Sequence, residues 1–319
     1  MKKIRIIDLF SGIGGIRLGV EQACSELKVR AECVFSSEID KYACRTYSEN
    51  FSDMPVGDIT QISEDDIADH DILLAGFPCQ AFSIAGLRNG FNDTRGTLFF
   101  DVARILKAKK PQSFILENVK GLLNHDGGRT FNTIVETLES LGYHISYQVL
   151  SAKDFGLPQN RQRVYIIGFT DKEKQSRFRF PLPMDKETKV GDILENLDEV
   201  QLKRYMLSIE QWEYHKQRKI RNKENGKGFG FQLFTKNSQY TATLSARYYK
   251  DGSEIFIEVP ERLPRRLTPR ECARLQGFPE NYKIVVSNTQ AYKQFGNSVS
   301  VPVIKEVAKM VLKALMKKE

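Results

Sequence analysis

The chain has 319 residues, of which 41% are hydrophobic, and its formal net charge is +8. This composition supports a packed core and excludes global disorder, and because no apolar run reaches 18 residues we expect no membrane span. The five cysteines contain no Cys-x-x-Cys pair and the four histidines are scattered, so we expect neither a metal site nor a disulfide framework. A reducing, cytoplasmic setting fits this cysteine usage.

Strands and helices alternate through the first 170 residues, since apolar runs predict strands and 3.6-residue periodicity predicts helices. The expected strands are 4–10, 33–37, 71–75, 112–116, 145–150 and 163–169. The expected helices are 16–27, 40–50, 96–109 and 130–141, with a further helix at 302–317. This order is typical of an α/β fold with a mostly parallel, doubly wound, Rossmann-like sheet.

The pattern changes after Pro183. Residues 185–225 are rich in charge, and residues 226–260 hold strand-like runs at 239–244 and 255–259. We therefore expect one domain formed by residues 1–183 and 287–319, and a smaller, mainly β domain at 184–286.

The basic excess lies in one segment of the chain. Residues 201–270 hold 15 Lys and Arg against 7 Asp and Glu, whereas the remaining residues hold 33 of each sign. A solvated basic surface and a segment that binds a polyanion are both compatible with this distribution.

A glycine-rich turn, Asp8-Leu9-Phe10-Ser11-Gly12-Ile13-Gly14-Gly15, follows the first expected strand and opens a helix. Such a turn binds cofactors in this context, although a tight strand–helix connection needs glycine anyway. Glu38 ends the second expected strand and is placed for ribose hydroxyls, and Asp58 is placed for an adenine amine. Both carboxylates would also be ordinary on a surface, so these residues alone leave the choice open.

Two chemically reactive side chains follow expected strands. Cys79 comes after the strand 71–75 and the turn residues Gly76-Phe77-Pro78, and Glu117 comes directly after the strand 112–116. Open α/β sheets place their chemistry at the carboxyl ends of strands, although a free cysteine is more often a small buried hydrophobe. A carboxylate beside a buried strand is poorly solvated and can hold a proton, whereas a helix cap or loop carboxylate is the plain alternative.

Arg161 and Arg163 lead into the last strand of this series. In a strand, side chains two residues apart point to the same side, so the two guanidiniums would together grip a phosphate or a base carbonyl. A pair of surface arginines is the simpler alternative.

Together these motifs resemble the ordered motifs of the DNA cytosine-5 methyltransferases. The stretches that carry the resemblance are the turn 8–15, Gly76-Phe77-Pro78-Cys79-Gln80, Glu117-Asn118-Val119, Gln159-x-Arg161-x-Arg163, the segment 266–279, and Gln294-Phe295-Gly296-Asn297-Ser298-Val299. Only residues 185–260 lack strong family motifs, and the bacterial restriction–modification enzymes of the family are closest in size and layout.

The resemblance implies that Cys79 adds to carbon 6 of a flipped-out cytosine, so that carbon 5 can take a methyl group from S-adenosylmethionine, leaving S-adenosylhomocysteine. Glu117 would act at ring N3 and Arg163 would bind the O2 carbonyl, while Arg161 would position the catalytic loop or a phosphate. The first domain would then bind the cofactor, and the smaller one would recognise the target sequence.

The resemblance also implies binding residues. The positions that match cofactor contacts are Phe10, Ile13, Gly14, Glu38, Ile39, Asp58, Ile59, Pro78, Leu98, Asn297 and Ser298. The candidate DNA contacts are Gln80, Ser83 and Arg95 in the loop after Cys79, and Arg218, Arg221, Thr243, Arg247 and Tyr248 in the basic segment. Ala85 stands where bacterial relatives often carry a serine, which puts a DNA contact from that position in doubt.

We thus expect a monomeric enzyme that methylates a specific double-stranded DNA sequence in the bacterial cytoplasm, at the nucleoid; a paired restriction endonuclease is left open. The alternatives are a tRNA-directed member of the family, a catalytically silent DNA-binding protein and a Rossmann dehydrogenase. The well-developed variable segment at 185–260 argues against the first, and the set of Cys79, Glu117 and Arg163 argues against the second. A dehydrogenase turn needs a third glycine where Arg17 stands.

Overall fold

The computed structural model describes residues 3–78, 98–226 and 230–316. Cys79, Gln80, Ser83, Ala85 and Arg95 lie outside the described residues. The chain divides into two compact units: the first holds Met1–Leu150, Gln162–Leu182 and Val303–Glu319, and the second holds Ser151–Arg161 and Pro183–Pro302. The segments 151–161 and 287–302 thus fall in the second unit, whereas the sequence placed them in the first domain; separate roles for the two domains stay a prediction.

The first unit is built on a six-stranded sheet with the strand order β2-β1-β3-β4-β6-β5. The strands are β1 (Lys3–Leu9), β2 (Arg30–Ser37), β3 (Ile72–Ala75), β4 (Ser113–Val119), β5 (His144–Ser151) and β6 (Gln162–Phe169). β1 pairs in parallel with β2 and β3, β3 pairs in parallel with β4, and β4 pairs antiparallel with β6. The predicted mostly parallel sheet is therefore confirmed, and every expected strand of this unit forms.

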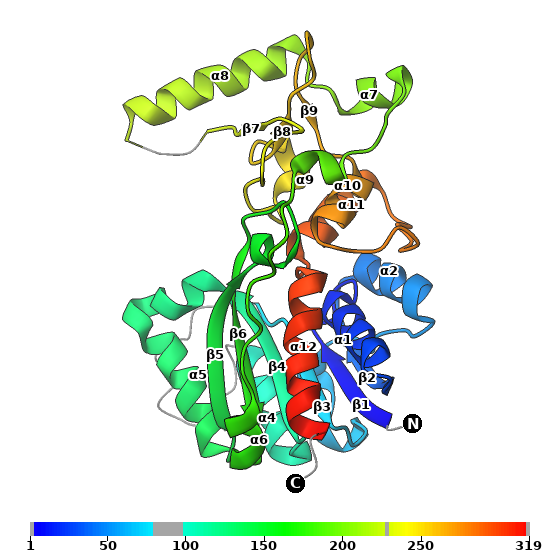
Figure 1. Cartoon of the computed structure of the whole chain (residues 1–319), viewed down its shortest axis with the longest axis vertical. Helices are drawn as coiled ribbons and strands as arrows, with labels where there is room; N and C mark the ends of the chain where they lie inside the picture. Colours follow the sequence, from blue (N-terminus) through cyan, green and yellow to red (C-terminus); the bar gives the residue numbers. More distant parts are fainter. Residues whose placement is uncertain (1–2, 79–97, 227–229, 317–319) are drawn as a thin grey trace. The chain divides into compact units, whose positions relative to one another are not determined.

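Helices cover both faces of this sheet. They are α1 (Gly15–Glu26), α2 (Lys41–Phe51), α4 (Leu98–Lys109), α5 (Arg129–Ser140), α6 (Lys172–Arg177) and α12 (Val301–Met316). Figure 1 shows α12 and α1 on one face and α4 and α5 on the other. On the α4 and α5 side, Ile7 and Leu9 of β1 and Phe114 of β4 form one apolar core with side chains of both helices. Asp8 lies between these two β1 residues, so its side chain faces the α1 side.

The second unit is more helical than the mainly β domain that the sequence predicted. It contains α7 (Glu199–Tyr205), α8 (Ile209–Glu224), α9 (Tyr248–Asp251), α10 (Pro269–Leu275) and α11 (Asn288–Asn297), with the two-residue strands β7 (Leu233–Phe234), β8 (Phe256–Ile257) and β9 (Arg265–Arg266) in one small sheet. The expected run 239–244 is not a strand, because only Thr241 pairs, in an isolated bridge with Gln159.

Short 3-10 helices connect several elements: η1 (Ile59–Gln61), η2 (Glu64–Asp66), η4 (Lys120–Gly128), η5 (Ala152–Phe155) and η6 (Val190–Ile193). Among the residues that the structure describes, no helix combines the length and apolar character needed to cross a membrane.

Candidate active site and cofactor turn

The turn after β1 adopts left-handed backbone conformations at Phe10 (φ 53°), Gly12 (φ 54°) and Gly14 (φ 77°). A Cβ atom on Gly14 would lie 2.2 Å from the ring of Phe51 in α2, so only glycine fits there. A Cβ atom on Gly12 would meet no described atom within 4 Å. The turn is therefore closely packed on its inner side and open on its outer side.

A buried polar cluster lies beneath this turn. The Tyr47 hydroxyl donates to Asp8 Oδ2 at 3.4 Å, and one Arg17 nitrogen donates to the Tyr47 hydroxyl at 3.0 Å and to Asp53 Oδ2 at 2.9 Å. Burial raises the pKa of Asp8 well above its usual value, although the charge of Arg17 opposes this shift. Arg17 thus ties α1 to α2 and to the segment after it. At position 17, where a dehydrogenase would have its third glycine, this chain has an arginine whose side chain joins α1 to α2.

Glu38 follows β2 and reaches the same turn. One carboxylate oxygen accepts from the Gly12 N–H at 2.8 Å, and the other accepts from the N–H groups of Ile39 and Asp40, each at 2.8 Å. A carboxylate has about four acceptor positions. Three are used by the described residues, which leaves one for a ligand hydroxyl.

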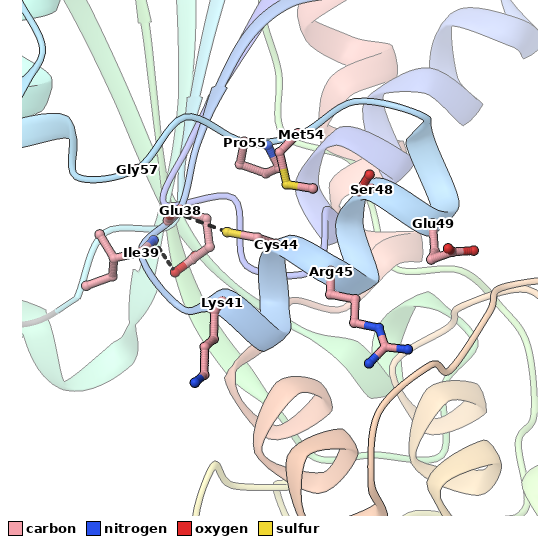
Figure 2. A pocket seen from close by; sticks show the side chains of 10 residues that line it. All are labelled: Glu38, Ile39, Lys41, Cys44, Arg45, Ser48, Glu49, Met54, Pro55 and Gly57. Atoms are coloured by element: carbon pink, nitrogen blue, oxygen red, sulfur yellow. Dashed lines mark hydrogen bonds between the residues drawn. The ribbon is translucent and has the colours of Figure 1, made fainter.

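A pocket of about 470 Å³ opens beside Glu38, between α2 and the segment 54–57. Figure 2 shows its lining residues Glu38, Ile39, Lys41, Cys44, Arg45, Ser48, Glu49, Met54, Pro55 and Gly57. Ile39 exposes 72% of its surface, which is unusual for an apolar side chain and leaves a face on which a flat ring can stack. Of the predicted cofactor residues, only Glu38 and Ile39 line this pocket.

The other predicted cofactor positions differ in exposure. Asp58 and Pro78 are exposed, and Phe10 and Leu98 are half-buried. Ile13 and Ile59 are each only 2% exposed, so each offers a ligand little surface in this structure. The carboxylates, the exposed Ile39 and the open side of the turn fit an adenosyl group. Asn297, which is exposed, and Ser298 end α11 in the second unit.

The predicted catalytic residues Glu117 and Arg163 meet in the first unit. β4 extends three residues beyond the expected strand, because its end pairs with β6 and places Val119 opposite Arg163. Glu117 Oε1 lies 3.1 Å from Arg163 Nε, and the two side chains are only 11% and 15% exposed. Glu117 is therefore held in place by a charged partner in a largely dry environment.

Asn118 has a positioning role that the sequence analysis did not assign. Its Nδ2 donates to the Phe77 carbonyl at 2.9 Å, and its Oδ1 accepts from the Val119 N–H at 2.8 Å. Asn118 thus fastens the end of β4 to the backbone two residues before Cys79. The only sequence signal was its place in the Glu117-Asn118-Val119 motif.

Arg161 does not form an anion grip with Arg163. It precedes β6, lies in the second unit, and is only 2% exposed. Its guanidinium donates to the carbonyl oxygens of Leu244 at 2.8 Å, Gly296 at 3.3 Å and Ser298 at 2.5 Å. The prediction that Arg161 and Arg163 point to the same side of one strand is therefore wrong. The strand begins at Gln162, after Arg161, and the Arg161 side chain binds main-chain carbonyls.

Among the described DNA-contact candidates, some side chains are exposed, some are bound to other parts of the protein, and Tyr248 is buried. Arg221 and Arg247 are exposed, as expected for contacts. Arg218 pairs with Asp251 at 2.6 Å, and Thr243 Oγ1 donates to the Asn160 carbonyl at 2.7 Å.

The prediction that Tyr248 contacts DNA is wrong. It is fully buried, and its hydroxyl donates to the Ile255 carbonyl and accepts from the Leu267 N–H, each at 2.8 Å. A side chain with no exposed surface cannot touch DNA in this structure. Tyr248 belongs to the core of the second unit.

The sequence pattern of the C-5 cytosine-specific DNA methylases matches residues 4–313, and the chain belongs to this family. It is an enzyme that transfers a methyl group from S-adenosylmethionine to carbon 5 of cytosine in DNA, and the relatives described next show that it is of the bacterial restriction–modification type. The predicted family and reaction are thereby confirmed.

Individual relatives agree with this assignment. The chain is 57% identical to Type II methyltransferase M1.ScrFI of Lactococcus lactis subsp. cremoris, over 99% of the chain and 79% of that protein. It is also 57% identical to Type II methyltransferase M.NlaX of Neisseria lactamica, over 98% of the chain and 97% of that protein. The Entamoeba histolytica methyltransferase EhMeth shares the fold, with a TM-score of 0.78 and 22% identity over 99% of this chain and 100% of that one.

Proposed function

We propose that Cys79, Glu117 and Arg163 carry out this methyl transfer on a cytosine flipped out of a specific double-stranded DNA sequence. The observation that supports this most directly is the 3.1 Å pair of Glu117 and Arg163 at the end of β4. Asn118 follows Glu117 directly and donates to the Phe77 carbonyl. It therefore connects the pair of Glu117 and Arg163 to the backbone that leads into Cys79.

The roles follow from the chemistry of cytosine. Carbon 5 is a poor nucleophile until the Cys79 thiolate forms a bond to carbon 6, which moves electron density onto carbon 5. Glu117 shares a proton with N3 and Arg163 donates to O2, so both stabilise the charge that develops on the ring. Bound S-adenosylmethionine supplies an electrophilic methyl group. A base then removes the proton from carbon 5, the bond to carbon 6 breaks, and the Cys79 thiolate is restored.

The adenosyl end of S-adenosylmethionine is proposed to bind on the open side of the glycine turn. The remaining acceptor position of Glu38 suits a ribose hydroxyl, the exposed Asp58 suits the adenine amine, and Ile39 with Phe10 and Leu98 offers apolar contact. Asn297 and Ser298 are proposed as further contacts from the late motif. Arg161 donates to the carbonyls of Gly296 and Ser298, so it would position these two contacts and would not touch the substrate.

The wider setting is also a proposal. The relatives named above are Type II methyltransferases, which supports a functional pairing of this chain with a restriction endonuclease. We propose that the chain acts as a monomer on DNA in the bacterial cytoplasm, at the nucleoid. Arg247 and Thr243, with Gln80, Ser83 and Arg95, are proposed DNA contacts.

Bisulfite sequencing of DNA from a host without its own cytosine methylation tests the reaction and gives the target sequence. Expression of the chain should methylate one short sequence throughout the genome, and Cys79→Ala should abolish this while DNA binding is kept. Cys24→Ala, which removes a buried thiol of α1, is the matched control and should keep methylation. Methylation by Cys79→Ala, or methylation found in tRNA and not in DNA, would refute the proposal.

A further inference from the structure

Gln159, two residues before Arg161, has no role in the proposed chemistry, yet its side chain is fully buried in the second unit. Its Oε1 accepts from the Leu244 N–H at 2.9 Å. Its Nε2 donates to the Leu275 carbonyl at 2.9 Å and to Gln276 Oε1 at 3.2 Å. Every polar atom of this side chain is therefore bonded to another part of the unit.

The partners of Gln159 determine both its residue type and its orientation. The Leu244 N–H can only donate and the Leu275 carbonyl can only accept, so the side chain between them must offer an acceptor and a donor. A glutamine amide offers both, whereas an ionised glutamate has no donor and a lysine has no acceptor. Loss of the amide would leave these buried main-chain groups unpaired, which is costly.

Gln276 extends the hydrogen bonds of Gln159 to the late motif. It is also fully buried, and its Nε2 donates to the Phe295 carbonyl at 2.7 Å. The hydrogen bonds thus run in one direction, from the Leu244 N–H through the two glutamine side chains to the Phe295 carbonyl. Hydrogen bonds arranged in such a chain polarise and strengthen one another.

The two main-chain segments that this chain joins are in direct contact. A Cβ atom on Gly296 would lie 2.1 Å from the Ser245 carbonyl oxygen, so only glycine fits there. Arg161 donates to the carbonyls of Leu244 and Gly296, and so binds both segments as well. Gln159 and Arg161 together bind the N–H and the carbonyl of a single residue, Leu244.

We propose that Gln159 is a positioning residue for both substrates of the enzyme. Through Leu244 it fixes the segment 243–247, which carries proposed DNA contacts, and through Gln276 it fixes the segment 295–298, which carries proposed cofactor contacts. The inference rests on the proposed function, which assigns those contacts. Because Gln159 is fully buried, it acts through these segments and touches neither substrate.

The alternative account is that the two buried glutamines only stabilise the core of the second unit. A stabilising role lowers the melting temperature and leaves the dissociation constants of the folded protein unchanged. A positioning role changes the dissociation constants at temperatures well below the melting temperature. Binding measured on the folded protein therefore separates the two accounts.

The test compares the full chain with its variants Gln159→Met and Gln276→Met. Methionine is unbranched and apolar and has no N–H donor. Fluorescence anisotropy gives the dissociation constant for a duplex that contains the target sequence, and calorimetric titration gives the constant for S-adenosylhomocysteine. The turnover number at saturating substrate and the melting temperature are measured as well.

Gln159→Met should raise both dissociation constants by about five- to tenfold, the effect of one lost buried hydrogen bond on each segment. Gln276→Met should raise only the constant for S-adenosylhomocysteine, because Leu244 keeps its bond to Gln159. The turnover number should stay near the wild-type value in both variants, since the Glu117–Arg163 pair does not involve either glutamine.

Thr268→Val is the matched control. It removes a buried hydroxyl of the second unit that accepts from the Glu271 N–H and donates to the Glu195 carboxylate, and neither partner belongs to the two segments. The control should lower the melting temperature and leave both dissociation constants unchanged.

Unchanged dissociation constants in Gln159→Met, or a rise for only one of the two ligands, would overturn the proposal. If Gln159→Met does not fold, Gln276→Met decides the question, because unchanged binding of S-adenosylhomocysteine or weaker binding of both ligands would contradict the assigned links. A wild type that binds neither ligand would instead refute the proposed function, so the two failures are distinguishable.

Discussion

At the scale of single residues, the glycine turn offers a matched pair of positions. Gly12 and Gly14 both have a positive φ, but only at Gly14 would a Cβ atom collide with Phe51. An L-residue in the left-handed region costs about 1–2 kcal/mol. Gly12→Ala should lower the free energy of unfolding by about that amount, and Gly14→Ala should lower it further because Phe51 must also move.

Urea unfolding of both variants checks this prediction, and calorimetric titration with S-adenosylmethionine adds a second readout. Gly14→Ala should weaken cofactor binding as well, because displacement of the turn moves Gly12, whose N–H donates to the Glu38 carboxylate. Equal losses of stability in the two variants would show that the contact with Phe51 does not constrain the turn.

At the scale of elements, α8 depends on a titratable contact. Burial lowers the pKa of His215 below its usual value of 6.5, with Asp251 raising it and Arg218 lowering it to a smaller extent. The folded protein thus prefers the neutral ring, whereas the unfolded chain binds a proton at about pH 6.5. The stabilisation by the neutral ring is complete above pH 6.5 and is lost as the pH falls through 6.5 towards the lower folded-state pKa.

His215→Phe tests this directly, because it keeps a ring against Phe256 and removes a buried Nδ1 that has no hydrogen-bond partner among the described groups. Urea unfolding is followed by the fluorescence of Trp212 at pH 7.5 and at pH 5.5. We expect the free energy of unfolding to fall less between pH 7.5 and pH 5.5 in the variant than in the wild type. Trp212 is the chain's single tryptophan and lies in α8. His144→Phe, in β5, is the control. If His215→Phe loses as much stability between the two pH values as the wild type does, the role of His215 is contradicted.

The elements differ in how far the sequence predicts them. The inner strands β3 and β4 contain continuous apolar runs because strands inside a sheet covered on both faces are buried, and this pattern is strong in the sequence. α8 has no apolar stripe of the usual width and is held by Trp212 and His215, so its clearest sequence signal is the capping box at Ser208. The two-residue strands of the second unit are too short for a period-2 pattern.

At the scale of the whole chain, the motifs predicted which residues matter better than how they are held. Glu117 and Arg163 are 46 positions apart and meet only through the antiparallel pairing of β4 with β6, a direction that no local pattern encodes. Arg161 reaches carbonyl groups more than 80 positions away, so the spacing of the two arginines gave the wrong geometry. Contacts of this kind depend on topology, which local propensity does not determine.

The central claim is that Cys79 bonds to the target cytosine, and a trapped complex tests it most directly. In a duplex whose target cytosine carries fluorine at carbon 5, no proton can be removed there, so the bond between sulfur and carbon 6 persists after methyl transfer. Mass spectrometry of the digested complex should place the nucleotide on Cys79. An enzyme that methylates normal duplex but forms no adduct, or forms it on Cys24, Cys33, Cys44 or Cys272, would contradict the account.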